Sequence, residues 1–142
     1  MLDCKSMPTP IDAIFKKMKV STSNYDMIDP TMYRQLIGSL MYLTNTGPDI
    51  CFVANTLSQF LSDPRQNHWV SAKLVLRYLR GTMGYGLRYA SGMYMILQGF
   101  SDSDWAGCVA YRKSTFGFFF ILGSVVISWG SRKHTSVSLS TA

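Results

Sequence analysis

The spacing of the apolar residues changes near Gly81, and this change restricts the chain to helices first and strands after. Between Pro30 and Gly81, large apolar side chains recur every three or four residues, which is the period of one face of an α-helix. After Gly81, short runs rich in aromatic and β-branched residues alternate with glycine-containing turns, which is typical of strands. We therefore predict an α+β chain in which three helices precede an antiparallel sheet.

Three short breaks containing Asp and Pro divide the helical part, and each is expected to begin a helix. Asp29-Pro30 offers an N-cap followed by a proline in the first turn, and this helix should run to about Thr44. Pro48-Asp49 begins a second helix, and Asp63-Pro64 begins a third that should end near Arg80. The apolar positions expected to form the core are Tyr33, Leu36, Ile37, Leu40, Met41 and Leu43, then Ile50, Val53, Ala54, Leu57 and Phe60, then Trp69, Ala72, Leu76 and Leu79.

Four later segments have the composition of strands, and residues 1–28 have no regular pattern. The expected strands are Tyr85–Tyr89, Met93–Ser101, Thr115–Leu122 and Val125–Trp129. Ser91-Gly92 and Gly123-Ser124 are expected to be tight turns between them. Pro8 and Pro10 disfavour a helix near the start, so we expect irregular structure there.

Positive charge dominates the chain and is concentrated in its middle. The chain has 14 Lys and Arg residues against 8 acids, and all eight acids are Asp. Between Pro64 and Ser101 there is no acid, while the basic residues there are Arg65, Lys73, Arg77, Arg80 and Arg88. Lys73, Arg77 and Arg80 are spaced to share one helix face. Such a face suits a phosphate backbone, because binding releases condensed counterions. A solvated basic helix would show the same pattern.

Cysteine usage and hydropathy indicate an intracellular protein, in the cytoplasm or the nucleus. Cys4, Cys51 and Cys108 are too scattered for a zinc motif and too few for a disulfide framework, so we expect reduced thiols. The N-terminus lacks the apolar core of a secretory signal. No stretch reaches the about 20 uninterrupted apolar residues of a membrane helix, so no membrane partner is expected.

Asp102-Ser103-Asp104 is the one compact group of acids. If this stretch is extended, Asp102 and Asp104 point to the same face, where they could begin a site for a hard cation such as Mg²⁺. The same spacing is also common in turns, where Asp bonds the local backbone. His68 and His134 have no spaced ligand partner. Arg77 to Arg80 spells the R-x-L-R string of secreted pathogen effectors, but it lies in an expected helix.

Several motifs, in unbroken order, resemble those of copia-type retrotransposon polyproteins. The stretch YRQLIGSLMYL at 33–43, followed by PDI, is similar to the family block Y-R-x-L-x-G-S-L-x-Y-L…R-P-D-I. Residues 72–82 resemble A-K-x-V-L-R-Y-L-K-G-T. Residues 101–108 with RKST at 112–115 resemble S-D-x-D-W-A-G-C…R-(R/K)-S-T. The resemblance covers nearly the whole chain, from DCK at 3–5 to LSTA at 139–142.

The resemblance implies a junction between two enzymatic domains. Residues 1–28 would be the tail of the reverse transcriptase, residues 29–83 a helical thumb or connection region, and residues 84–142 an incomplete RNase H-like domain. Asp102 would be the first carboxylate of a two-Mg²⁺ site that hydrolyses RNA in an RNA–DNA hybrid. Asp104 would lie beside it, as a further metal ligand or as a structural acid.

Departures from the family pattern limit what this chain can do. The family continues S-T-A-E-A-E-Y, so its next metal-binding Glu would follow Ala142, and Gly47 replaces a usual Arg. We therefore expect the remnant of a decayed element, without catalysis or bound Mg²⁺ by itself. It would bind an RNA–DNA hybrid weakly through Lys73, Arg77, Arg80 and Arg88, and would join the remainder of the polyprotein if expressed together. The alternative is a short recruited interaction or effector-like protein derived from a retroelement.

Overall fold

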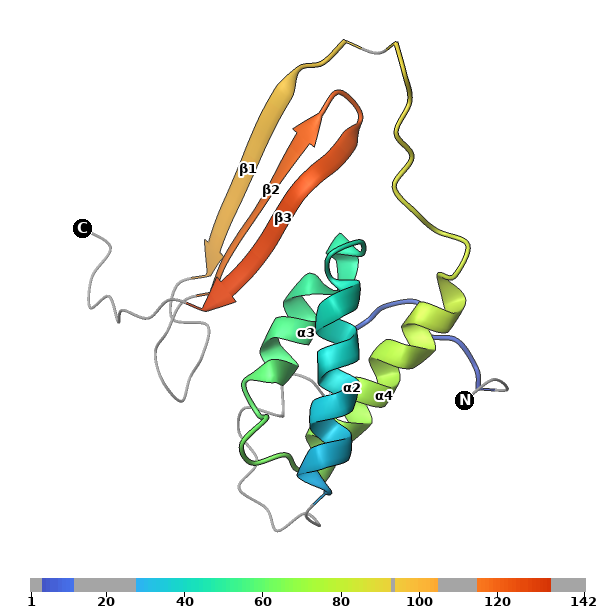
Figure 1. Ribbon diagram of the computed structural model, residues 1–142, viewed down its shortest axis with the longest axis vertical. Helices are drawn as coiled ribbons and strands as arrows, with labels where there is room; N and C mark the ends of the chain where they lie inside the picture. Colours follow the sequence, from blue (N-terminus) through green and yellow to red (C-terminus); the bar gives the residue numbers. More distant parts are fainter. Residues whose placement is uncertain (1–3, 12–27, 93, 105–114, 134–142) are drawn as a thin grey trace, which may run out of the picture. The chain divides into compact units, whose positions relative to one another are not determined.

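The chain forms two compact units, one helical and one a sheet (Figure 1). In the computed structural model the described residues are 4–11, 28–92, 94–104 and 115–133, and only the backbone is described at 103 and 104. The first unit is Met1–Tyr85 and the second is Gly86–Ala142. Three α-helices and a three-stranded antiparallel sheet confirm the predicted α+β class.

The helices of the first unit begin close to the predicted breaks. They are α2 (Pro30–Leu43), a 3-10 turn η1 (Pro48–Ile50), α3 (Cys51–Ser58) and α4 (Gln66–Gly81). The carboxylate of Asp29 accepts a hydrogen bond from the Thr31 N–H at 2.8 Å, so the predicted N-cap of α2 is confirmed. Residues 4–11 have no helix or strand, as expected, whereas most of the remaining N-terminal stretch, 12–27, lies outside the described residues.

The three helices pack around one apolar core. Its buried members are Tyr33, Ile37, Leu40, Ile50, Val53, Ala54, Leu57, Ala72 and Val75. The hydroxyl of Tyr33 is buried there and donates to the Leu57 carbonyl at 2.9 Å, which satisfies the polar atom. Burial raises the pKa of Tyr33 above its ordinary value. The prediction was wrong for Leu43, which is 40% exposed because it lies at the last turn of α2.

The start and the buried face of α4 differ from the prediction. The helix begins at Gln66 with Arg65 as its N-cap, so Asp63 does not cap it and instead pairs with Arg65 at 3.1 Å. His68 is buried and stacks on Phe60, with ring centres 3.9 Å apart. The face toward the core therefore follows His68, Ala72 and Val75. The predicted Trp69, Leu76 and Leu79 lie at its margin, partly buried.

The sheet unit is a meander in the order β1-β2-β3. Its strands are β1 (Leu97–Asp104), β2 (Thr115–Leu122) and β3 (Val125–Lys133). The bounds of β2 and the Gly123-Ser124 turn are as predicted, and Gly123 takes a φ of 64° that favours glycine. The predicted strand Met93–Ser101 is shifted toward Asp104, and β3 runs four residues past Trp129.

The predicted strand Tyr85–Tyr89 is not a strand. Its residues alternate as a strand does, but a strand also needs a neighbour with which to form a hydrogen-bonded ladder. This stretch forms no such ladder with the sheet, and the Tyr89 hydroxyl instead donates to the Val126 carbonyl at 3.3 Å. A side chain, rather than the backbone, joins this segment to β3.

Both faces of the sheet carry aromatic side chains. Phe116, Phe118 and Phe120 share one face of β2, and on the other face Phe100 stacks on Phe119 with ring centres 4.9 Å apart. Ser131 is the one buried residue among those that the structure describes in this unit. A sheet with one apolar and one solvated face would instead alternate apolar and polar residues.

Two glycines make room for the aromatic rings. A Cβ added at Gly130 would lie 2.6 Å from the Phe118 ring, and a Cβ added at Gly99 would lie 2.7 Å from the Phe120 ring. Each ring therefore lies across the glycine of a neighbouring strand. Since real Cβ atoms do not approach so closely, any larger residue at either position would displace a ring.

Candidate nucleic-acid and metal sites

Asp102 lies on the outer strand β1, with an exposed side chain. The predicted extended backbone from Gly99 to Asp104 is confirmed, so positions 102 and 104 face the same side of the sheet. Across the sheet, Asp102 is paired with Gly117, which is paired in turn with Ser131 on β3. Gly117 has no side-chain atom within 4 Å of where a Cβ would lie, so the position next to Asp102 is open.

The described donors do not complete a magnesium centre. Mg²⁺ takes about six oxygen ligands in octahedral geometry and keeps several waters. Across the described stretches, from Cys4 to Lys133 with their gaps, no group of three His, Cys, Asp or Glu side chains could hold a metal. Asp102 contributes one carboxylate to this exposed edge. A two-metal arrangement would need further acids beside it.

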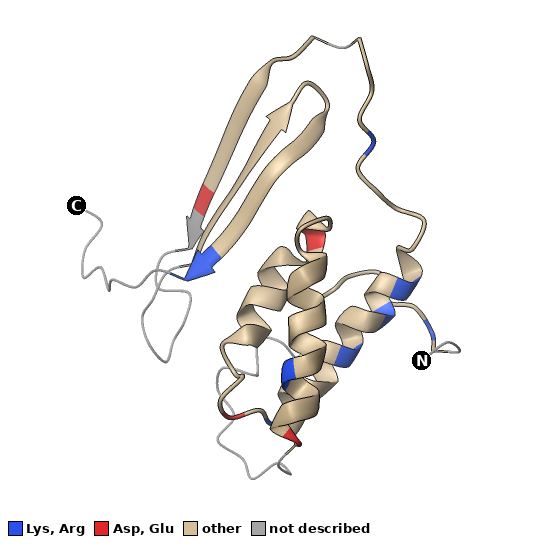
Figure 2. Ribbon diagram, viewed as in Figure 1, with Lys and Arg blue, Asp and Glu red and all other residues tan. Residues whose placement is uncertain are grey.

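The three basic residues predicted on the third helix lie together on α4. Figure 2 shows Lys and Arg positions along α4 and no acidic position on it. Lys73 and Arg80 are exposed, whereas Arg77 is partly buried. The Lys73 Nζ lies 5.0 Å from the centre of the Trp69 ring, which holds the ammonium close to the helix.

Arg77 has a structural role that the helical spacing did not reveal. Its Nε donates to the Lys5 carbonyl at 2.7 Å, and the Met7 N–H donates to the Arg77 carbonyl at 3.3 Å. Ser6 also comes so close to Gly81 that a Cβ there would lie 3.0 Å from the Ser6 Cβ. Residues 4–11 therefore run against α4 and bring the exposed Lys5 beside its basic face. No local pattern predicts this, because Lys5 and Arg77 are 72 positions apart.

Arg88 does not belong to the α4 group. It lies in the sheet unit, in the segment Gly86–Ala90, which is neither helix nor strand, and there it lines a groove together with Ser124 and Val125. Of the four basic residues that were predicted to bind nucleic acid, three therefore lie on one face of α4 and the fourth, Arg88, lies in the other unit. The exposed trio Lys5, Lys73 and Arg80, with Arg77 between them, is the basic surface of the helical unit, and we call it the α4 basic face.

Two of the motifs that carry the family resemblance are joined by a short hydrogen bond. The Tyr78 hydroxyl donates to Asp49 Oδ2 at 2.6 Å, which links η1 to α4. This bond to a carboxylate, helped by burial, raises the pKa of Tyr78 to about 12. Asp49 is therefore engaged in packing the helices together, and its other oxygen accepts the Ile50 N–H at 3.1 Å.

No helix among the described residues combines the length and the apolar character that crossing a bilayer requires.

The R-x-L-R string of residues 77–80 lies within α4, as predicted. Its first arginine is the residue bonded to the Lys5 carbonyl. The string is therefore part of a packed helix, which differs from the flexible setting that such a targeting string needs.

Comparison with known proteins reveals several relatives. The chain is 41% identical over 141 residues to an uncharacterized mitochondrial protein of Arabidopsis thaliana, covering 99% of this chain and 58% of that protein. It is 41% identical over 137 residues to the retrovirus-related Pol polyprotein from transposon RE2 of the same plant, of which it spans 9%. It is 44% identical over 110 residues to the secreted RxLR effector protein 161 of Plasmopara viticola, covering 77% of this chain and 78% of that protein.

No family profile matches the chain, and no solved structure is significantly similar to it. The Pol polyproteins from RE2 and from two further transposons, RE1 of Arabidopsis and TNT 1-94 of tobacco, are matched over 96 to 99% of this chain. These relatives are polyproteins of the same family whose motifs the sequence resembles, so the predicted resemblance is confirmed. The chain belongs to the family of retrovirus-related Pol polyproteins of copia-type transposons.

Proposed function

We propose that this chain is a retroelement remnant corresponding to the junction between the reverse transcriptase and the RNase H domain. Residues 1–28 would then derive from the polymerase tail, residues 29–83 from its thumb or connection region, and residues 84–142 from the RNase H-like sheet. The change from helices to an antiparallel meander near Gly81 supports this assignment. So does the unbroken order of the family motifs along the chain.

In this proposal the chain does not hydrolyse nucleic acid by itself. Two-metal hydrolysis requires a cluster of carboxylates that stabilises both the attacking and the leaving oxygen. Residues 86–142 contain two acids, Asp102 and Asp104. Mg²⁺ would be the cofactor of the complete family site, with Asp102 as one ligand and Asp104 as a neighbouring acid, and we expect this chain to bind none tightly.

The function that the geometry supports best is weak binding of nucleic acid by the α4 basic face. One observation carries it: Lys73, Arg77 and Arg80 lie along a helix that has no acid, and Lys73 and Arg80 are exposed. Phosphate contacts from the three exposed residues of this face, Lys5, Lys73 and Arg80, would give a logarithmic salt slope of about −2.7, since each contributes roughly −0.9 on a duplex. An RNA–DNA hybrid is the expected ligand, in the cytoplasm or nucleus. Other parts of the polyprotein would be partners when made together.

Fluorescence anisotropy with a labelled RNA–DNA hybrid over a salt series tests the binding proposal. The Lys73→Gln/Arg80→Gln double variant should weaken binding and reduce the salt slope by about 2. The matched control is Arg34→Gln/Arg132→Gln, which removes the same charge from other surfaces. Equal effects of the two pairs would show that net charge alone, rather than the α4 basic face, attracts the hybrid.

Incubation with the hybrid and millimolar Mg²⁺ tests the hydrolysis proposal. We expect no cleavage, either by the chain or by its Asp102→Asn variant. Cleavage by the chain that disappears in Asp102→Asn would contradict the proposal, because it would show that these residues assemble a working metal site. Cleavage that persists in the variant would indicate a contaminating nuclease, so it is checked in a mock purification.

The alternative is that the chain is a recruited interaction or effector-like protein derived from a retroelement, and its similarity to the Plasmopara viticola effector is the observation that supports it. A protein partner bound through packed surfaces would survive salt and nuclease treatment. Binding to nucleic acid would weaken at high salt, because it depends on counterion release, and would be lost once nuclease has digested the ligand. Co-purification of one protein at high salt after nuclease digestion would therefore favour the alternative.

A further inference from the structure

We propose that a groove between the segment Gly86–Ala90 and the start of β3 binds an extended peptide carrying an acidic side chain. The groove has a volume of about 490 Å³, within the range of sites that bind small ligands or short peptide segments. All of its lining residues belong to the sheet unit. The proposal stands apart from the binding of nucleic acid by the α4 basic face.

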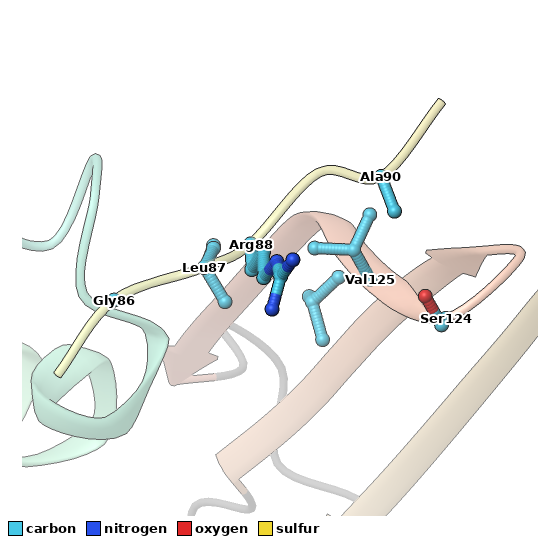
Figure 3. A pocket seen from close by; sticks show the side chains of 7 residues that line it. Gly86, Leu87, Arg88, Ala90, Ser124 and Val125 are labelled. Carbon is cyan, nitrogen blue, oxygen red and sulfur yellow. The ribbon is translucent and has the colours of Figure 1, made fainter. Parts of the chain in front are cut away.

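The lining of the groove is apolar with one positive charge. Leu87, Ala90, Val125 and Val126 supply apolar surface, and Ser124 supplies a hydroxyl at the turn. In Figure 3 the Arg88 guanidinium lies toward the space that Leu87 and Val125 also line. There is no acid in the lining, so the charge of Arg88 is complementary to a carboxylate rather than to a cation.

The backbone on one side of the groove belongs to an outer strand. In the sheet order β1-β2-β3, β3 has β2 as its one neighbour among the described strands. The outward N–H and C=O groups of such a strand can pair with an added strand. An extended peptide in the groove would form this ladder and place alternate side chains toward Arg88.

A side-chain hydrogen bond holds the two walls of the groove together. The segment Gly86–Ala90 is joined to β3 by the Tyr89 hydroxyl, which donates to the Val126 carbonyl at 3.3 Å. The segment is therefore held beside β3 by a side chain and does not pair with it through the backbone.

A smaller cavity continues the groove past the β2–β3 turn. Its volume is about 140 Å³, and its lining includes Tyr89, Tyr94 and Leu122. It shares Ala90, Ser124 and Val125 with the larger groove. A peptide with an apolar residue near its acidic one would fill both. An oligonucleotide has no backbone amides with which to extend the ladder of β3, and this favours a peptide.

The test measures binding of the full chain to two labelled heptapeptides by fluorescence anisotropy. Both alternate valine and threonine, with blocked ends, and they differ only in a central glutamate or glutamine. The glutamate peptide should bind roughly fivefold more tightly, which corresponds to a partly exposed ion pair. Arg88→Gln should abolish this preference, and Arg88→Lys should retain most of it. Arg80→Gln is the matched control for charge and should leave the preference unchanged.

Location and backbone pairing are tested with the same probes. Amide chemical shifts should change at Ser124–Val126, and N-methylation of alternate peptide amides should weaken binding at least tenfold, because it removes donors to β3. Equal affinity for the two peptides, equal losses in Arg88→Gln and Arg80→Gln, or shifts confined to α4 would each overturn the proposal. Displacement of the glutamate peptide by a thymidine hexanucleotide would overturn it as well, by showing that the Arg88 site prefers phosphate.

Discussion

The helical unit and the sheet unit differ in what they bury. The helical unit encloses a core of large apolar residues, and its buried tyrosine hydroxyl has a partner. The sheet unit has more aromatic side chains for its size, yet Ser131 is its one buried residue among those described. Regular hydrogen bonding is present in both units. The comparison teaches that correct strands and register do not by themselves provide burial, which is the main source of stability.

The largest expected effect contrasts one residue from each unit. Leu40→Ala should lower the free energy of unfolding of the helical unit by about 3 kcal/mol, because it leaves a cavity in a closed core. Phe119→Ala should cost the sheet unit about 1 kcal/mol or less, because Phe119 is 41% exposed. Urea unfolding with separate probes for each unit measures both. Equal losses would mean that the aromatic faces are covered in solution.

A second prediction is that mild acid lowers the stability of the helical unit more than that of the sheet unit. Burial, with help from Arg65 and against the opposing effect of Asp63, lowers the pKa of His68 to about 4, whereas the unfolded chain has a value near 6.5. Between these values the unfolded chain binds more protons, so stability falls as the pH is lowered through this window. The loss in the helical unit should reach about 2 kcal/mol at pH 5.

Urea unfolding at pH 7 and pH 5 measures this loss, with His68→Gln as the control that removes the titrating group. The variant should be less stable at pH 7 because the ring stacks on Phe60, but its stability should change little between the two values of pH. The sheet unit has no described histidine and should also change little. A wild-type helical unit equally stable at both pH values would contradict the prediction.

The smallest predicted effect lies within the sheet. Gly99→Ala and Gly130→Ala should each destabilise the strands by about 1 kcal/mol, because the new Cβ would collide with a phenylalanine ring. Gly117→Ala is the matched control in the same sheet, since its Cβ would meet only backbone atoms at 3.9 and 4.0 Å. Hydrogen exchange of β2 amides reports the difference. Similar protection in all three variants would show that the rings move aside freely.

Predictions from local pattern succeeded where local chemistry determines the structure. Asp29-Pro30 marked the start of α2 because a cap and a proline act within one turn. The bounds of β2 followed from its aromatic run and the glycine turn after it. Segments whose structure depends on a distant neighbour were predicted less well. Tyr85–Tyr89 has the residues of a strand, but no strand of the sheet pairs with it.

In the candidate sites, too, features set by local spacing were predicted and features that depend on distant residues were not. Helical spacing correctly grouped Lys73, Arg77 and Arg80, since the three share one element. It could not reveal Lys5 beside them, because that placement depends on a hydrogen bond across 72 positions. Likewise, the burial of His68 follows from packing on Phe60, which no spacing rule contains. Arg88 was grouped by charge with residues that belong to the other unit.

The bond between Arg77 and the Lys5 carbonyl has a practical consequence for dissecting this protein. A truncated version that starts after residue 11 would release the guanidinium of Arg77 and expose the end of α4 near Gly81. Its affinity for polyanions could then rise although a lysine had been deleted. Binding measured on a fragment whose ends were chosen from the helix bounds alone would thus reflect a surface that the intact polypeptide does not expose.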